Sequence, residues 1–209
     1  LFSANAAEIK DLNANGDADK VVEITGDAFA TNLNIGKGSV KVGDNLTTTN
    51  IVFTDADFGK LIVDVAKAHV IAGVAAQDAA KKSHGTIEIS ANVAANAVTF
   101  GKLGDSGKDA ALALLDIQNA NVGSKVTLVA GSHITAIKAA GAGKLSIIGD
   151  QKIGSIELVQ SGQLGLEIAG ITKLINAKGA GNTADFGTTG STLGAVSFIA
   201  NNELTIEDG

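Results

Sequence analysis

The chain has 209 residues, of which 45% are hydrophobic, 18% are charged and 3% are aromatic, and its formal net charge is −6. This hydrophobic content excludes a disordered chain, and the length is enough to bury a core. Cys is absent, which excludes disulfides, zinc–thiolate sites and thiol catalysis. Arg is also absent and the chain is acidic, which disfavours nucleic-acid binding.

The apolar residues are almost all aliphatic, since Trp, Tyr and Met are absent and the aromatic residues are seven Phe. Val, Ile, Leu and Ala fill thin layers between stacked backbones better than a broad globular centre. The sequence has no apolar stretch of about 18 residues, the length that a membrane-spanning helix needs. It begins without Met and ends in a strand-like pattern, so we expect a processed or excised part of a longer protein.

The first third of the chain contains short runs that alternate apolar and polar residues, as half-buried strands do. Residues 1–20 are polar and rich in Asn and Asp. The strand-like runs that follow are residues 21–25, 32–35, 39–42, 51–54, 59–65 and 68–74.

Two segments in the middle of the chain are ambiguous. Residues 75–84 form either a helical turn or a projecting loop. Residues 105–120 form either a helix, because Ser106 can cap a run of Ala and Leu, or a fully buried strand. Strand-like runs at residues 86–90 and 97–100 lie between the two segments.

Residues 125–178 show the most regular pattern. Six apolar runs start about ten residues apart there, separated by Gly-containing turns. A Gly/Thr-rich loop is expected at residues 178–194, and strands at 195–200 and 203–207 complete the chain.

This pattern predicts an all-β fold, a right-handed parallel β-helix that forms one elongated solenoid over residues 1–209. Two or three strands per coil give roughly 20–30 residues per coil, the length typical of solenoid units. A β-sandwich is the alternative, because short strands at this spacing are also its signature. Gly- and Ala-rich turns, continuous β-branched runs and the lack of aromatic core anchors favour the solenoid.

One segment near the N-terminus resembles a calcium-binding loop. Oxygen-bearing side chains alternate there, and Gly16 permits a sharp turn. The candidate ligands are Asp11, Asn13, Asn15, Asp17 and Asp19. An EF-hand would have a bidentate Glu where this chain has Val22. The alternative is an Asn/Asp-rich turn without metal, since these residues form such turns readily. Calcium is the only cofactor that the sequence suggests.

The sequence contains no catalytic constellation. The acidic residues Asp55, Asp57 and Asp64 lie on or near strand-like runs, and we expect solvated turn residues rather than the paired carboxylates of a glycoside hydrolase. His69, His84 and His133 are far apart, and each is expected to be exposed or hydrogen-bonded rather than a ligand. No Ser lies in a nucleophile elbow, and the Gly-rich segments lack P-loop spacing. We therefore expect a protein that is not an enzyme.

The chain resembles the passenger region of bacterial autotransporters, of the kind found in rickettsial outer-membrane protein B and related surface cell antigens. The resemblance rests on SVKVGDNLTTTNIVF, GTIEISANVAANAVTFGKLGD, KLSIIGDQKIGSIELVQSGQLGLEI and AVSFIANNELTIEDG. It implies display on the bacterial cell surface, anchored in the outer membrane in the full-length protein, and adhesion to host cells in virulence. The terminal β-barrel of such proteins is absent from this sequence.

Three functions remain open. The first is a structural and adhesive module whose partner is a host-cell surface protein or a neighbouring surface subunit, with contacts expected at residues 75–84, 103–110 and 178–194. The second is a subunit of a surface lattice (an S-layer), which an acidic, Thr/Ala/Gly-rich chain with a calcium loop would also suit. The third is a β-helix enzyme acting on polysaccharides, which the lack of Arg, Trp and Tyr disfavours.

Overall fold

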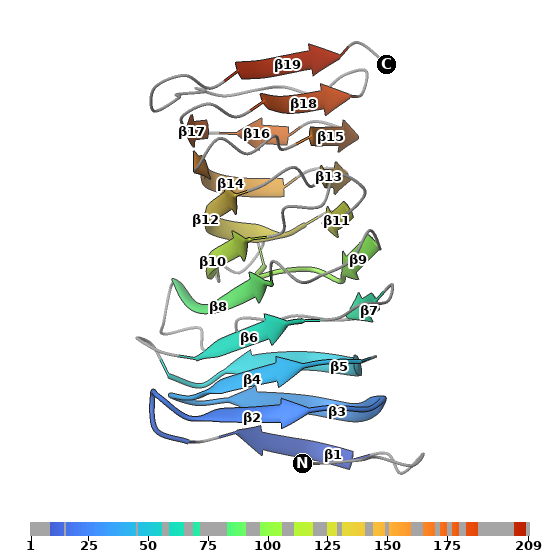
Figure 1. The fold of residues 1–209 in the computed structure, drawn as a ribbon, viewed down its shortest axis with the longest axis vertical. Coiled ribbons are helices and arrows are strands. Elements are labelled where there is room, and N and C mark those ends of the chain that lie inside the picture. The colour runs from blue at the N-terminus through green and yellow to red at the C-terminus, as the bar shows by residue number, and fades with distance from the viewer. Residues whose placement is uncertain are drawn as a thin grey trace.

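The computed structural model is a stack of short parallel strands, with the N-terminus at one end and the C-terminus at the other (Figure 1). It describes residues 9–14, 16–44, 46–55, 59–64, 69–71, 83–90, 97–105, 111–118, 125–128, 131–140, 144–148, 151–159, 165–169, 172–174, 177–179, 183–187 and 203–207. All regular elements in these ranges are strands, so none of the described residues forms a helix that could cross a membrane.

The strands alternate along the chain between two sides of the stack. The even-numbered strands form one long sheet: β2 (Val21–Ile24), β4 (Ser39–Val42), β6 (Lys60–Val63), β8 (Ser83–Ile89), β10 (Ala111–Ile117), β12 (His133–Ala140), β14 (Gln151–Val159) and β16 (Thr172–Leu174). Strand β17 (Ala177–Gly179) pairs with the second half of β14.

The other strands form three further sheets along the stack. The first contains β1 (Ile9–Ala14), β3 (Ala28–Ile35) and β5 (Leu46–Phe53). The second contains β7 (His69–Ile71), β9 (Ala97–Phe100), β11 (Lys125–Leu128), β13 (Lys144–Ile148) and β15 (Gly165–Ala169). The last contains β18 (Thr183–Gly187) and β19 (Glu203–Glu207).

Every pairing among the described strands is parallel, and the separation in sequence between paired residues gives the length of a coil. The separation is short between β2 and β4, where Val21 pairs with Ser39. It is longest between β7 and β9, where His69 pairs with Val98, and it becomes short again between β12 and β14. These pairings confirm a β-solenoid with coils of the predicted length, and they exclude the β-sandwich, whose sheets are antiparallel.

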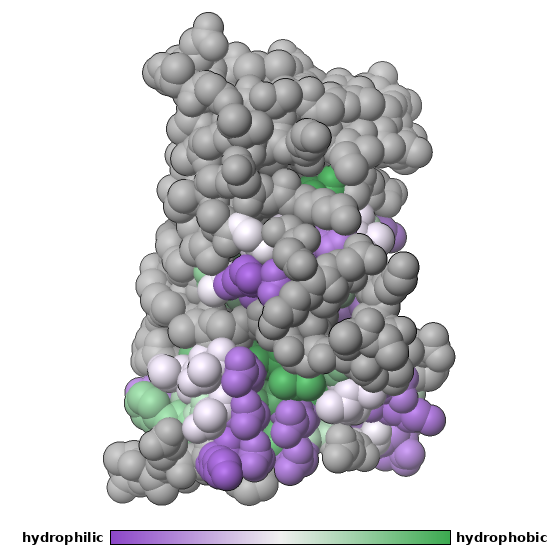
Figure 2. All heavy atoms as spheres, turned by 180° about the vertical axis from the view of Figure 1, so that it is seen from behind, coloured by the Kyte–Doolittle hydropathy of each residue, from purple (hydrophilic) through white to green (hydrophobic). Residues whose placement is uncertain are grey.

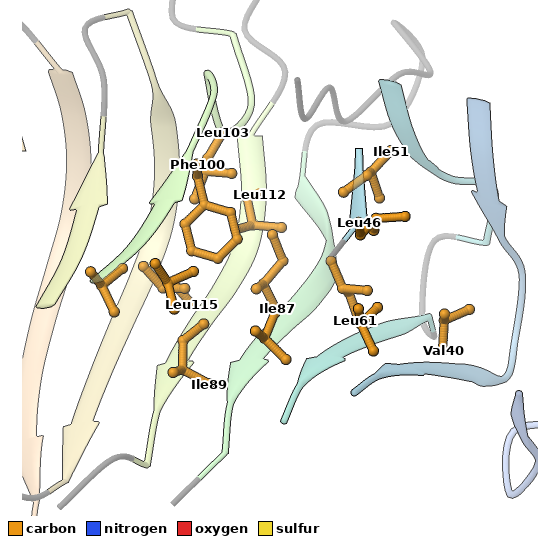
Figure 3. Close-up of a cluster of buried hydrophobic side chains, with 14 of the residues drawn as sticks. Val40, Leu46, Ile51, Leu61, Ile87, Ile89, Phe100, Leu103, Leu112 and Leu115 are labelled. Atoms are coloured by element: carbon orange, nitrogen blue, oxygen red, sulfur yellow. The ribbon is translucent and has the colours of Figure 1, made fainter. Parts of the chain in front are cut away.

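The core consists mainly of aliphatic side chains stacked in register between the two sides, and two aromatic side chains, Phe53 and Phe100, are also fully buried in it. Ile24, Val42, Val63, Ile89 and Ile117 follow one another in paired positions of β2, β4, β6, β8 and β10, and all are at most 2% exposed. Figure 3 shows side chains from both sides directed into the same interior space. Burying each such side chain stabilises the fold by about 1.5–3 kcal/mol, so the stacked aliphatic side chains supply most of the stability of the core.

Strands β3, β5, β10 and β12 each contain one break in the alternation of buried and exposed residues, which marks a bend in the strand. In β10, Leu112 and Leu115 are both buried, although they are three residues apart and strict alternation would place them on opposite faces of the strand. The pairing of β10 with β8 and with β12 skips Ala113. The two halves of β14 even pair with different strands, β16 and β17. A bent strand therefore contributes to two faces of its coil.

Gly85 occupies the corresponding bend of β8 and has a φ of +79°, a conformation that residues with a side chain rarely adopt. A Cβ atom at this position would overlap the ring of Phe53 from the coil below. The bend of β8 therefore requires glycine for both conformation and space.

The structure settles one ambiguous segment and corrects two expectations. Residues 111–117 of the segment 105–120 form strand β10, while 106–110 and 119–120 lie outside the described residues. The expected Gly/Thr-rich loop at 178–194 is wrong for residues 178–179, which belong to β17, and for residues 183–187, which form β18. The alternative of an Asn/Asp-rich turn at residues 11–19 is also wrong for residues 11–14, which belong to β1 (Ile9–Ala14). The strand predicted at 195–200 lies outside the described residues.

Candidate functional site: polar ladders on the outer surface

The most ordered polar feature of the described surface is a set of stacked Asn and Asp side chains on β1, β3 and β5. The Asn50 side-chain amide donates to Asn32 Oδ1 (2.8 Å), and the Asn32 amide donates to Asp11 Oδ1 (2.7 Å). Beside this column, the Asn34 amide donates to Asn13 Oδ1 (2.8 Å). We call these five residues the Asx ladder. It links three successive coils through their outward-facing side chains.

The Asx ladder forms because stacked coils place equivalent residues in register. Asp11 pairs with Asn32 and Asn13 pairs with Asn34 in the β1–β3 register, and Asn32 pairs with Asn50 in the β3–β5 register. Parallel strands about 4.8 Å apart bring the two side-chain amides within hydrogen-bonding distance. Each amide group can both donate and accept, so the hydrogen bonds can repeat from coil to coil.

The residues of the predicted calcium loop are divided between a strand and a turn. Asp11 and Asn13 lie on β1 and accept hydrogen bonds in the Asx ladder. Asp17 and Asp19 are exposed in the turn after β1, and Asn15 lies outside the described residues. Among the residues that the structure places, no group of three or more acidic, His or Cys side chains could hold a metal ion. The five-residue calcium site stays a prediction.

Two of the other three acidic residues singled out in the sequence, Asp55 and Asp64, lie in the described part of the chain. Asp64 follows β6 and forms an ion pair with Lys41 (2.7 Å between Nζ and Oδ2). Asp55 is half-buried just after β5, and Asp57 lies outside the described residues.

The three His residues lie on three different strands, β7, β8 and β12. His84 is 1% exposed, which sequence reasoning missed because it placed residues 75–84 in a loop or turn. Ser132 is also buried, and its Oγ accepts a hydrogen bond from the backbone N–H of Leu103 (3.0 Å). Both His84 and Ser132 are part of the packed stack.

A second polar feature is a set of ion pairs on the outer face of the even-numbered sheet. Lys41 on β4 contacts Glu23 of the coil below (3.5 Å) as well as Asp64. Lys60 on β6 contacts Glu88 on β8 (2.9 Å). The hydrogen bond and the attraction between the charges of Lys41 and Asp64 raise the pKa of Lys41 above its usual value. These contacts also connect neighbouring coils.

The segments expected to contact a partner are partly incorporated in the stack. Leu103 is fully buried, and its backbone oxygen accepts a hydrogen bond from the His133 N–H (2.7 Å). Ser83 and His84 belong to β8. Residues 75–82 and 106–110 lie outside the described residues.

On the face seen in Figure 2, hydrophilic side chains gather over the N-terminal coils around a smaller hydrophobic area. Only two large hydrophobic side chains among the described residues are exposed, Val21 (55%) and Phe29 (42%). The described surface is therefore organised by stacked polar and charged side chains. Comparisons of the chain with protein-family models, with curated proteins and with solved structures gave no match.

Proposed function

We propose that this chain is a structural and adhesive surface module, a β-solenoid that holds binding segments outward toward another cell or a neighbouring subunit. One observation supports this proposal above the others. The even-numbered sheet keeps the same parallel pairing from β2 to β16, although the separation in sequence between paired residues changes along it. Within this sheet, the separation in sequence is shortest between the paired residues Val21 and Ser39 and longest between Ser83 and Ala111. A scaffold with this property accepts extra residues between its strands without losing its register.

The physical reason is that most of the contacts between neighbouring coils, among the residues that the structure describes, are made by the strands. Backbone pairing, the aliphatic core and the outward ion pairs all involve residues of the strands or next to them. Segments between strands can change length at a small cost, since the entropy of closing a loop grows slowly with its length. Insertions in solenoids project from the stack, where they are available for binding.

The segments proposed to contact the partner are residues 75–82 and 106–110. The separation in sequence between paired residues is greatest in the pairings that span these segments, which are β6 with β8, β7 with β9, β8 with β10 and β9 with β11. The proposed partner is a protein or a glycan on another surface, because the chain has neither Arg nor a basic charge balance to favour nucleic acid. The proposed location on a bacterial surface rests on the resemblance to autotransporter passengers alone.

The proposal is tested by measuring how the purified, fluorescently labelled chain binds to cultured host cells. One variant has Gly and Ser in place of residues 75–82, and a second has them in place of residues 106–110. The matched control replaces the connection at residues 25–27, in a short N-terminal coil, with Ser-Gly-Ser. Circular dichroism shows whether each variant keeps the β-solenoid.

We expect saturable binding that falls about tenfold or more in at least one segment variant and is unchanged in the control, since a few residues dominate most interfaces. Binding that is equal in all folded variants would contradict the role given to these segments. Ordered sheets seen by electron microscopy only in the presence of calcium would favour the S-layer function instead. Turnover of a uronic-acid polymer would replace both with an enzyme.

A further inference from the structure

Each strand of the first coil has one edge that pairs with no other strand among the described residues. Strand β1 is the terminal strand of the β1–β3–β5 sheet, and β2 is the terminal strand of the even-numbered sheet. The inner edge of each strand pairs with the next coil, β1 with β3 and β2 with β4. The outer edge of a terminal strand offers backbone N–H and C=O groups, which another strand can pair with.

The Asx ladder has a direction that ends at this edge. Both Asn50 and Asn32 donate their amide hydrogens toward the N-terminal neighbour, and Asp11 only accepts. An ionised Asp has two acceptor oxygens, and Asn32 uses one of them. In the second column Asn13 accepts from Asn34 through its oxygen, which leaves the amide hydrogens of Asn13 to continue the column. The edge therefore offers an acceptor at Asp11 and a donor at Asn13.

The interior side chains of the first coil are more exposed to solvent than the paired side chains of the next coil. Leu12 and Val22 are only partly buried, although they pack against the core. Their register partners in the next coil, Leu33 and Val40, are 0% exposed. Covering Leu12 and Val22 with one more layer of aliphatic side chains would stabilise the end of the stack.

We propose that the outer edge of β1 is a docking site for a parallel β-strand with alternating Asx and aliphatic residues. The docking edge continues the interface between coils, because the required partner has the same chemistry as residues 32–35 of β3. In that segment Asn32 and Asn34 face outward onto Asp11 and Asn13, while Leu33 pairs with Leu12 in the core. A strand added to a free sheet edge gains backbone hydrogen bonds, and its side chains provide specificity.

This inference does not depend on the proposed adhesive function, since it concerns the end of the stack and not the segments of its long coils. The probe is a synthetic peptide with the sequence of residues 26–37, GDAFATNLNIGK, titrated into the full chain by calorimetry. A second peptide with Leu at both outward Asn positions is the sequence control. The chain variants are Asn13→Leu at the docking edge and Asn50→Leu two coils away, at the far end of the Asx ladder.

We expect saturable binding of the first peptide to the unchanged chain. Its affinity for the Asn13→Leu chain should be about five- to tenfold lower, because a hydrogen bond is lost. The Asn50→Leu chain should bind the peptide as the unchanged chain does. Equal binding of the two peptides, or no binding, would overturn the proposal.

Two other results would assign the edge to a different occupant and also overturn it. One is self-association of the full chain in sedimentation that Asn13→Leu abolishes, which would make a second copy the partner. The other is peptide binding only by a chain that begins at Ile9, which would assign the edge to residues 1–8.

Discussion

The N-terminal coils (residues 9–64) and the central coils (residues 69–140) use the same parallel pairing in coils of different length. Paired residues are close in sequence in the N-terminal coils, as Val21 and Ser39 are. In the central coils the separation is larger between β7 and β9 and between β8 and β10, and it decreases again between β10 and β12. The comparison shows that the strands, and not the length of the coil, determine how one coil packs on the next.

The two regions also differ in which strands bend. In the N-terminal coils the bent strands are β3 and β5, where pairing skips Thr31 and Thr49. From β8 onward the bent strands belong to the even-numbered sheet, and Gly85 is the first skipped position there. The bends therefore move from the odd-numbered to the even-numbered strands between Phe53 and Gly85. These two residues lie close together in the structure. The junction of the two regions is therefore the place where a small change should have the largest effect.

The variant Gly85→Val should destabilise the protein more than any other single change proposed for this chain. It places a side chain at a φ of +79° and drives it into the ring of Phe53. Backbone strain and overpacking together are expected to lower the free energy of unfolding by about 3–6 kcal/mol. The measurement is urea denaturation followed by circular dichroism.

Gly26→Ala is the matched control, because a Cβ there meets no atom within 4 Å. It should leave the stability unchanged within about 1 kcal/mol. Adding Phe53→Leu to Gly85→Val should recover the part of the loss that comes from overlap with the ring. If Gly85→Val is as stable as Gly26→Ala, the junction does not depend on this contact.

A core truncation in each region tests whether the two regions unfold together. Leu33 lies in the N-terminal coils and Leu115 in the central coils, and both are 0% exposed. Leu33→Ala and Leu115→Ala should each lower the free energy of unfolding by about 2–5 kcal/mol. Since each coil contacts mainly its neighbours, Leu33→Ala should produce a separate, earlier transition in urea. A single transition in both variants would show that the junction couples the regions fully.

The strands of this fold were predictable where aliphatic residues alternate with polar ones. Residues 39–42, 97–100, 144–148 and 203–207 were predicted as strands with the bounds that the structure gives. The nature of residues 111–117 was not predictable from local sequence, because Ala and Leu suit helices as well. Stacking decides it, since Leu115 pairs with Ile87 on one side and Ile137 on the other.

The Asx ladder was missed because two of its residues, Asp11 and Asn13, also fit the pattern of a calcium-binding loop. Asp11 and Asn13 alternate with Leu12 on a strand just as ligands alternate in a calcium loop. The signal that could have found the ladder is repetition across coils, since Asn32 and Asn34 repeat the same alternation one coil later. A local motif cannot show this, because the hydrogen bonds join residues that only the stack brings together.

Removing the middle of the Asx ladder should have a moderate effect that is confined to the N-terminal coils. Asn32→Ala removes the hydrogen bonds to both Asp11 and Asn50, and should lower the free energy of unfolding by about 1–2 kcal/mol. Asn34→Ala removes the bond to Asn13 and should cost about half as much. Denaturation in urea measures both. Equal losses would mean that the number of ladder bonds does not determine the stability.

The smallest expected effect belongs to the ion pairs of Lys41, and it depends on pH. The hydrogen bond to Asp64 raises the pKa of Lys41 in the folded protein above its value in the unfolded chain, which is about 10.4. The stabilisation is therefore fully present below about pH 10 and is lost as the pH rises through the raised pKa. Thermal melts at pH 8 and pH 11 should show a stability difference between the unchanged chain and Lys41→Gln that shrinks at pH 11. The exposed Lys37→Gln is the charge-matched control, and a difference that persists at pH 11 would mean that Lys41 acts through its packing and not its charge.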